Sequence, residues 1–445
     1  MKGRAKDSVS YDVFFAFSNI MNTTQLKQSI LDGKFDKEFI MLYGETDIAR
    51  ERYCEAVDEF VSLYGQRDNV RLFSAPGRTE IGGNHTDHQH GLVLAGSVNL
   101  DVIAVVSANN NGIIRIKSKG YHMDEINTDN LAKVESETGR SRSLVRGVLA
   151  AFKNGGYNVG GFDAYTTSNV LKGSGLSSSA AFEVLVSNIV NGLYNEHSVD
   201  AINIAKYSQF AEREYFGKPC GLLDQMASSV GGFTYADFND PQNPVVEKIS
   251  LDLNKSGHTL CVIDTGGNHA NLTQDYADIT LECKAVSECL GVHFLRDANE
   301  DEFYKNIADI RSKCGDRAVL RAMHIFNENR RVLTQKSALR RGDFNTFFVC
   351  VKRSGESSYD LLQNVYSPSN PKEQAISLAL ALTKQFLNGR GAYRVHGGGF
   401  AGTIQCYIPN GMFDAYKQMI EAVFGENSCV KLFVRPVGGY ELKGE

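Results

Sequence analysis

Residues 169–183, NVLKGSGLSSSAAFE, place glycines and hydroxyl side chains directly before a helix-forming run. Gly173 and Gly175 permit backbone conformations that other residues avoid, and the serines 177–179 lead into the helix. Backbone N–H groups and hydroxyls that converge at a helix N-terminus suit the binding of phosphate. The segment is not a Walker A loop, because no Gly-Lys-Ser/Thr ends it. The alternative interpretation is a serine-capped helix after a glycine turn.

A second segment, 75–91 (APGRTEIGGNHTDHQHG), concentrates polar side chains among glycines just after a predicted strand, where binding residues often gather. One interpretation is a metal site, although the order of its His and Asp residues matches no familiar ligand pattern. The other is recognition of a ligand with many hydroxyls, which Asp and Asn accept. The polar residues are Arg78, Glu80, Asn84, His85, Asp87, His88 and His90.

A third segment, 211–232, contains Asp224 among Leu222, Leu223 and Met226, where a carboxylate is costly without a partner. Arg78 is a candidate partner. A guanidinium beside Asp224 would lower the pKa of the carboxyl group, whose oxygens could orient a hydroxyl or accept its proton. The alternative is that Asp224 caps the helix that follows. A further glycine cluster at 394–403, RVHGGGFAGT, is by itself a tight turn.

Composition excludes several classes of protein. The 445 residues include 47 Lys and Arg against 52 Asp and Glu, and this net charge of −5 does not favour a nucleic-acid partner. No run of about 18 apolar residues predicts a membrane span, and the apolar stretch 13–17 is too short for a signal peptide, so we expect a cytoplasmic protein. The nine Cys form no CxxC pair, which indicates reduced thiols.

Hydrophobic periodicity predicts the elements that position these segments. Residues 1–65 are expected to be a helical extension, and a domain boundary is expected near 231–241. The polar turn 108–112 predicts that strands 98–107 and 113–117 form a hairpin. Helices are predicted at 46–64, 143–152, 179–194, 200–216, 275–290, 316–330, 372–387 and 412–424, and further strands at 70–75, 162–167, 259–264, 405–408 and 430–434.

Taken in order, the four segments resemble the galactokinase branch of the superfamily of galactokinase, homoserine kinase, mevalonate kinase and phosphomevalonate kinase (GHMP kinases). GRTEIGGNHTDH matches the family's GRxNxxGEHTDY, GSGLSSSAA matches GxGLSSSAA, CGLLDQ matches CGIMDQ, and GGGFAG matches GxGFGG. The resemblance extends from about Val70 to the C-terminus. It implies an α+β fold of two domains, one like ribosomal protein S5 over 66–235 and one ferredoxin-like over 236–445, with the active site between them.

The activity implied by the resemblance is transfer of phosphate from ATP, with Mg²⁺, to the anomeric hydroxyl of a galactose-like sugar. By the same resemblance Asp224 is the base or the hydroxyl-orienting carboxylate, and Arg78 is its partner. Ser179 and Glu212 would bind Mg²⁺. The ATP phosphates would meet Gly173, Ser174, Gly175, Leu176, Ser177, Ser178 and Ser179, and the sugar would meet Asn84, His85, Thr86, Asp87, Gly221 and Tyr276. No nucleic-acid or membrane partner is expected.

Two departures from the family pattern bear on the substrate. Asn84 stands where the family has a Glu that contacts the C6 hydroxyl, and Glu80 stands where the family has Asn. Galactose is the expected sugar, and galacturonic acid, L-arabinose and N-acetylgalactosamine are the alternatives. His88 replaces a Tyr, and the segment after Tyr276 lacks the family's Arg pair. A non-catalytic sugar sensor is disfavoured, because Ser177–Ser179, Glu212 and Asp224 are all present.

Overall fold

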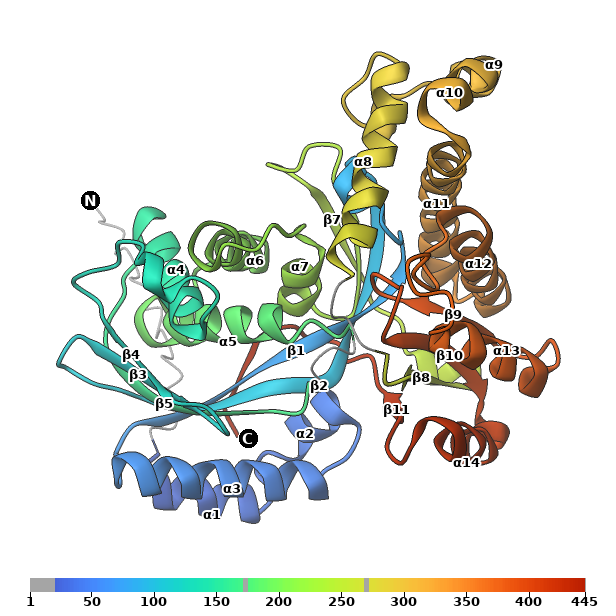
Figure 1. The fold of residues 1–445 in the computed structure, drawn as a ribbon. Helices are drawn as coiled ribbons and strands as arrows, with labels where there is room; N and C mark the ends of the chain where they lie inside the picture. The colour runs from blue at the N-terminus through green and yellow to red at the C-terminus, as the bar shows by residue number, and fades with distance from the viewer. Residues whose placement is uncertain (1–20, 171–174, 268–271, 445) are drawn as a thin grey trace, which may run out of the picture.

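The computed structural model describes residues 21–170, 175–267 and 272–444. Its elements form two units of helices and strands, each built around one sheet (Figure 1). The larger sheet has the order β12-β1-β2-β5-β3-β4, and β6 pairs with β2 and β7. Its strands are β1 (Val70–Gly82), β2 (Leu92–Ala108), β3 (Ile113–Ser118), β4 (Met123–Asn127), β5 (Phe162–Ser168), β6 (Phe233–Asp237), β7 (Val245–Ile249) and β12 (Tyr440–Leu442).

The predicted hairpin between residues 98–107 and 113–117 is wrong. Both segments are strands, but β5 lies between them, antiparallel to β2 and parallel to β3. The partner of β3 in a hairpin is instead β4. Strand pairing here follows burial rather than the nearest turn: Ala164 at the centre of β5 is fully buried, and the strand is covered from both sides.

Helices cover both faces of the larger sheet (Figure 1). The side chains of the first three helices form a separate apolar cluster with Leu72, Ile103, Val105 and Tyr165 of the sheet. On this face lie α1 (Thr23–Leu31), α2 (Asp36–Tyr43) and α3 (Asp47–Tyr64), which confirms the helix predicted at 46–64. On the opposite face lie α4 (Ser141–Asn154), α5 (Ser178–Tyr194), α6 (Ala201–Phe210) and α7 (Leu223–Val230).

The smaller sheet is antiparallel, in the order β11-β8-β10-β9. Its strands are β8 (His258–Asp264), β9 (Ala392–His396), β10 (Thr403–Pro409) and β11 (Cys429–Leu432). One face packs against α13 (Ala375–Leu387) and α14 (Phe413–Phe424). The other packs against α12 (Phe344–Ser357), whose Phe347 ring contacts the Tyr407 ring edge to face.

A helical arm projects from the body of the molecule (Figure 1). It contains α8 (Thr273–Cys289), α9 (Glu300–Lys305), α10 (Ile307–Cys314) and α11 (Asp316–Arg341) around their own apolar cluster. Short helical turns occupy Asp87–Gln89, Glu135–Glu137, Ala211–Phe216, Leu253–Ser256, Leu295–Asp297, Ser358–Leu362 and Asn410–Met412. None of the helices within the described ranges has both the length and the apolar character needed to cross a membrane.

The boundary expected at residue 235 falls inside the larger sheet. Strand β6 spans that position, and β7 pairs with β6 as far as Ile249, so the first unit continues at least that far. The C-terminal strand β12 also returns to pair with β1. The turn between β6 and β7 has the polar composition typical of a domain boundary. The pairing of β7 with β6 shows that it lies within the first unit.

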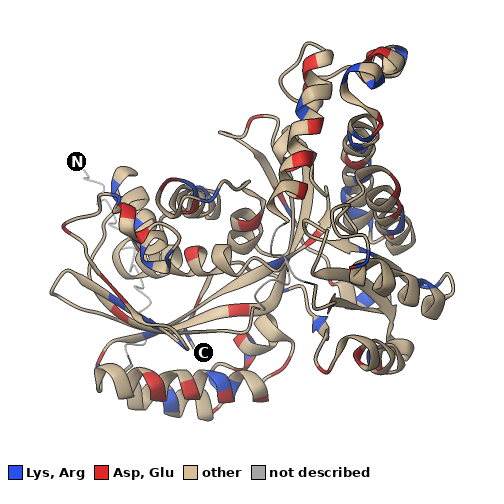
Figure 2. Cartoon of the chain, viewed as in Figure 1, with Lys and Arg blue, Asp and Glu red and all other residues tan. Residues whose placement is uncertain are grey.

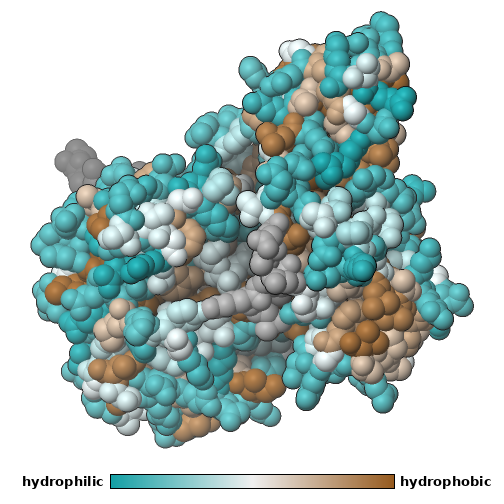
Figure 3. Space-filling model, in the orientation of Figure 1, coloured by the Kyte–Doolittle hydropathy of each residue, from teal (hydrophilic) through white to brown (hydrophobic). Residues whose placement is uncertain are grey.

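Basic and acidic residues are interspersed along the helices and strands in the ribbon of Figure 2. This agrees with the small net charge of −5. The face shown in Figure 3 is mostly hydrophilic, and a group of hydrophobic residues on it lies beside the helices of the smaller sheet.

Candidate active site

Strand β1 supplies two side chains to one pocket. Its register against β2 shifts between Pro76 and Arg78 and again between Glu80 and Gly82, as in the β-bulges that re-aim side chains beside active sites. Arg78 and Glu80, two residues apart, lie on the same face of the strand and line a pocket of about 190 Å³. The other lining residues are Gly83, Asn84, His85, Asp87, Cys220, Gly221, Leu223, Asp224, Gly397 and Gly398.

Asp224 and Arg78 form an ion pair in this pocket. Arg78 Nε donates to Asp224 Oδ1 at 2.8 Å, and a second guanidinium nitrogen lies 2.7 Å from the same oxygen. The other oxygen of Asp224 accepts from the hydroxyl of Ser177, at the start of α5. Arg78 is almost fully buried, whereas the Asp224 side chain is 33% exposed toward the pocket. Asp224 lies in the first turn of α7 but makes no capping hydrogen bond, so its carboxylate serves the pocket rather than the helix end.

The start of α5 also lies beside Glu212, on the turn 211–216. Ser179 Oγ donates to Glu212 Oε1 at 3.0 Å, and Lys218 Nζ donates to the same oxygen at 2.7 Å. The second oxygen accepts from Gln225 Nε2 at 2.6 Å. The structure therefore brings the predicted metal ligands Ser179 and Glu212 together, close to Asp224.

Part of the predicted phosphate loop lies outside the described residues, namely Gly173 and Ser174. Of the rest, Gly175 has φ +70° and its carbonyl accepts from Arg78. The side chain of Leu176 is buried in the core, so only its backbone could face a ligand. Ser177 has φ +58°, and Ser178 begins α5.

The loop after β1 presents three of its predicted residues, Asn84, His85 and Asp87, to the pocket. His85 Nε2 is 2.9 Å from the Gly398 carbonyl. Asp87 approaches Gly221 so closely that a Cβ on Gly221 would lie 2.3 Å from its carboxylate, which explains the glycine. Burial raises the pKa of Asp87, and the charge of Asp224 raises it further while His85 lowers it. The Thr86 hydroxyl instead lies within 2.9 Å of two carbonyls of its own loop, those of Gly83 and Leu92.

Tyr276 lies outside the lining of this pocket. Its hydroxyl donates to the Gly399 carbonyl at 2.9 Å, its ring packs edge-on against Phe400, and a Cβ on Gly398 would come within 2.5 Å of that ring. Tyr276 therefore supports the glycine turn 397–399. Within this glycine turn, the Gly397 carbonyl accepts a hydrogen bond from Asn84, and the Gly398 carbonyl contacts the His85 ring.

The metal interpretation of 75–91 gains no support from the geometry. In the parts of the chain that are described, no group of three or more His, Cys, Asp or Glu is placed to hold a metal ion. The ring of His90 stacks on Phe294, with centroids 3.6 Å apart. Burial lowers the pKa of His88 to about 3, so its imidazole is neutral.

Sequence reasoning missed four contributors to the site. Glu80 was named among the polar residues of 75–91 and as a departure from the family pattern but was given no role in the site, although its spacing of two from Arg78 on a strand was a usable signal. Cys220 and Gln225 belong to the CGLLDQ motif and could have been included with it. Burial raises the pKa of Cys220, so it lines the pocket as a thiol. Lys218 had no local signal, because its ion pair with Glu212 depends on the turn 211–216.

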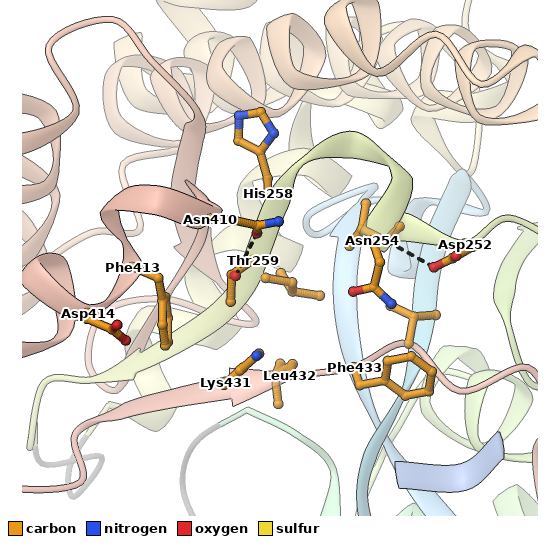
Figure 4. Close-up of a pocket in the computed structure, with 13 residues that line it drawn as sticks. Asp252, Asn254, His258, Thr259, Asn410, Phe413, Asp414, Lys431, Leu432 and Phe433 are labelled. Atoms are coloured by element: carbon orange, nitrogen blue, oxygen red, sulfur yellow. Dashed lines mark hydrogen bonds between the residues drawn. The ribbon is translucent and has the colours of Figure 1, made fainter. Parts of the chain in front are cut away.

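A second pocket, of about 250 Å³, lies elsewhere, between β8, β11 and α14 (Figure 4). Its polar side chains already bind within the protein: Thr259 donates to Asn410 Oδ1 at 2.9 Å, and Asp252 accepts from the backbone of Asn254. Lys431 lies 5.9 Å from the centroid of the Phe413 ring. This second pocket shares no lining residue with the pocket of Arg78 and Asp224.

Comparisons with known proteins identify the family of this chain. A family model described as the galactokinase galactose-binding signature matches residues 58–108, and one described as the GHMP kinases N terminal domain matches residues 143–232. The galactokinase of Thermotoga neapolitana is 30% identical over 363 residues, which are 80% of this chain and 95% of the relative. That of Streptomyces coelicolor is 29% identical over 372 residues, 82% of this chain and 92% of the relative.

The fold has solved counterparts. The crystal structure of Lactococcus lactis galactokinase complexed with galactose superposes with a TM-score of 0.72 at 23% identity, covering 86% of this chain and 98% of that one. The Methanococcus jannaschii mevalonate kinase gives a TM-score of 0.57 at 14% identity, covering 83% and 99%. The predicted α+β architecture of two domains is thereby confirmed as the GHMP kinase fold.

Proposed function

The chain belongs to the galactokinase family, and on this basis we propose that it transfers the γ-phosphoryl group of ATP to the anomeric hydroxyl of galactose, releasing galactose 1-phosphate and ADP. The observation that carries the proposal is the Arg78–Asp224 pair, which lies between a pocket lined with polar groups and the serine-rich start of α5.

On the sugar side, Asp224 is the acceptor for the anomeric hydroxyl. It orients the oxygen for attack on phosphorus and takes up the proton as the O–P bond forms and the bond to ADP breaks. Arg78 holds Asp224 in place and contributes positive charge beside the transferred group. His85, Asp87 and Gly221 border the same pocket and would contact the other hydroxyls of the sugar.

On the phosphate side, backbone N–H groups at the start of α5 and the hydroxyls of Ser177–Ser179 would bind the ATP phosphates. A serine hydroxyl and one carboxylate fit Mg²⁺, which usually keeps several waters and phosphate oxygens as its other ligands, so Ser179 and Glu212 would hold it. Bound there, Mg²⁺ would neutralise phosphate charge.

Because the nine cysteines are free thiols, we place the reaction in the cytoplasm.

The test is Mg²⁺- and ATP-dependent release of ADP with galactose, N-acetylgalactosamine, galacturonic acid, L-arabinose and glucose. We expect the highest kcat/KM with galactose. Asp224→Asn should fold normally and lower kcat at least about 100-fold, because it removes the proton acceptor. Asp47→Asn, a change at a side chain that is 92% exposed on α3, is the control and should leave kcat unchanged.

Other outcomes would redirect the proposal. Faster turnover of galacturonic acid or L-arabinose would keep the kinase chemistry but change the substrate. Binding of sugar and ATP without any release of ADP would indicate a sensor. Full activity of Asp224→Asn would remove Asp224 from the mechanism.

A further inference from the structure

Asn84 borders the sugar pocket, but its side chain is fully occupied by protein partners. Its amide nitrogen donates to Glu80 Oε1 at 3.0 Å and to the Gly397 carbonyl at 2.7 Å. Its amide oxygen accepts from Asn364 Nδ2 at 2.9 Å and from Ser358 Oγ at 3.3 Å. The residue is 0% exposed. Because each hydrogen of its NH₂ group already has an acceptor, Asn84 has no donor left for a sugar.

Glu80 places a carboxylate in the pocket directly beside Asn84. Its Oε1 accepts from Arg394 at 2.6 Å and from Asn84 at 3.0 Å. Within the described ranges, no protein donor lies in hydrogen-bonding distance of Oε2, although Glu80 lines the pocket on the same face of β1 as Arg78. One oxygen is thus fixed by the protein, and the other can accept a hydrogen bond from a ligand.

The surroundings of Glu80 make this arrangement rigid. Arg394 is 0% exposed, and it also donates to the Ile81 carbonyl at 3.0 Å, so the guanidinium is anchored to the strand that carries Glu80. A buried ion pair held by additional hydrogen bonds keeps its carboxylate in one orientation. Compared with the family pattern, the Asn and the Glu have exchanged positions 80 and 84, and the side chains at these positions touch.

We propose that Glu80, and not Asn84, is the specificity-determining residue of the sugar pocket, and that its Oε2 accepts a hydrogen bond from one sugar hydroxyl. This inference rests on the proposed sugar kinase function. A fixed carboxylate attracts a hydroxyl donor and repels a second carboxylate. The pocket therefore selects a neutral sugar over the corresponding uronic acid, which is the opposite of what Asn84 alone indicates.

The experiment pairs a protein change with changes in the ligand. Wild-type protein and Glu80→Gln are assayed with galactose and its 2-, 3-, 4- and 6-deoxy analogues. For one analogue, loss of the hydroxyl should lower kcat/KM of the wild type roughly tenfold or more, the usual effect of a hydrogen bond to a charged group. In Glu80→Gln, kcat/KM for the same analogue should fall much less relative to galactose, because the substitution and the missing hydroxyl remove the same interaction.

Glu80→Gln leaves the buried Arg394 without its ion-pair partner, so two further variants separate specificity from folding. Glu80→Gln/Arg394→Gln replaces the ion pair by two neutral amides and should show the same loss of discrimination. Glu137→Gln breaks another buried pair, with Arg146 at 2.8 Å, outside the pocket. It should lower stability without altering the ratio of kcat/KM between galactose and any analogue.

The proposal would be overturned if each deoxy analogue lowered kcat/KM by the same factor in the wild type and in both Glu80 variants. It would also be overturned if the wild type turned over galacturonic acid as fast as galactose. If the wild type does not phosphorylate galactose at all, the proposed function fails separately. The role of Glu80 is then tested with deoxy analogues of the panel sugar that is turned over, or by the binding affinity of these analogues if none is.

Discussion

The residues around Glu212 form a chain of buried polar groups behind the predicted metal ligands. The amide nitrogen of Gln225 donates to Glu212 Oε2 at 2.6 Å and to Glu183 Oε2 at 3.1 Å. Glu183 and Gln225 are both fully buried. Burial and the neighbouring charge of Glu212 raise the pKa of Glu183, which favours its neutral form. Gln225 therefore fixes the orientation of Glu212 without adding a charge.

From this we predict that Gln225→Leu weakens the use of Mg²⁺. Glu212 loses a hydrogen bond that aims its carboxylate, and the loss of such an outer partner typically lowers metal affinity about 10- to 100-fold. The Mg²⁺ concentration for half-maximal ADP release should rise accordingly, while the KM for the sugar stays the same. Gln242→Leu, at an exposed position, is the control. An unchanged Mg²⁺ dependence in a folded Gln225→Leu protein would contradict this role.

At the scale of elements, helix α11 links the helical arm to the loop after β1. It runs to Arg341, well beyond the predicted end at 330, and stops at Gly342, which has φ +68°. One turn apart on this helix, His324 Nε2 lies 3.0 Å from the Asn84 carbonyl and Glu328 accepts from the Gly83 backbone at 3.1 Å. The helix thus fixes the backbone of the loop after β1 through two hydrogen bonds.

His324 makes this contact sensitive to acid. Burial is the largest influence on its pKa, which is lowered to about 4 from an ordinary value of 6.5. The folded state thus holds His324 neutral, and the unfolded state takes up its proton first as the pH falls. This contribution to stability is complete above pH 6.5 and is lost toward pH 4, by an amount on the order of 3 kcal/mol.

We therefore expect the free energy of unfolding, measured in urea, to fall between pH 6.5 and 4.5 in the wild type and to fall less in His324→Gln. Glu328, with its pKa lowered to about 2, loses its own contribution only below about pH 4.5. His88, with its pKa lowered to about 3, adds to the wild-type slope in the same window, so the share of His324 is the difference between the wild type and His324→Gln. His122→Gln, at an exposed site, should retain the wild-type slope. Identical slopes for all three proteins would refute the assignment.

At the scale of the whole molecule, a buried network joins segments from both ends of the chain. Asp101 of β2 is 0% exposed and lies 2.5 Å from Arg52 of α3 and 3.4 Å from Arg435 near the C-terminus. It also accepts from the Tyr43 hydroxyl at 2.7 Å. The N-terminal helices are therefore fastened to the larger sheet by charge as well as by apolar packing.

Asp101→Asn should destabilise the protein by about 3–5 kcal/mol, because it leaves two guanidinium groups without their common carboxylate. Urea unfolding monitored by circular dichroism measures the change. Asp58→Asn is the matched control: it breaks an ion pair of 2.6 Å with Lys27 on the surface, and its effect should stay within about 1 kcal/mol. Equal effects of the two substitutions would show that burial does not strengthen the Asp101 network.

The sequence alone determined the elements with strong local signals and the residues that their motifs bring together. Helix α3 was predicted to within one residue because apolar side chains recur along one of its faces. The pairing of Arg78 with Asp224 was also predicted, because a carboxylate among apolar neighbours needs a cation.

Tertiary structure decided which polar groups remain free for a ligand. Strand β5 separates β2 from β3 because burial of a whole strand outweighs a short turn between its neighbours. The side chain of Asn84 is occupied by hydrogen bonds to Asn364 and Gly397, which lie 280 and 313 positions later in the chain. The capacity of a side chain to bind a ligand depends on the hydrogen bonds that the protein has already satisfied, and those partners meet only when the chain has folded.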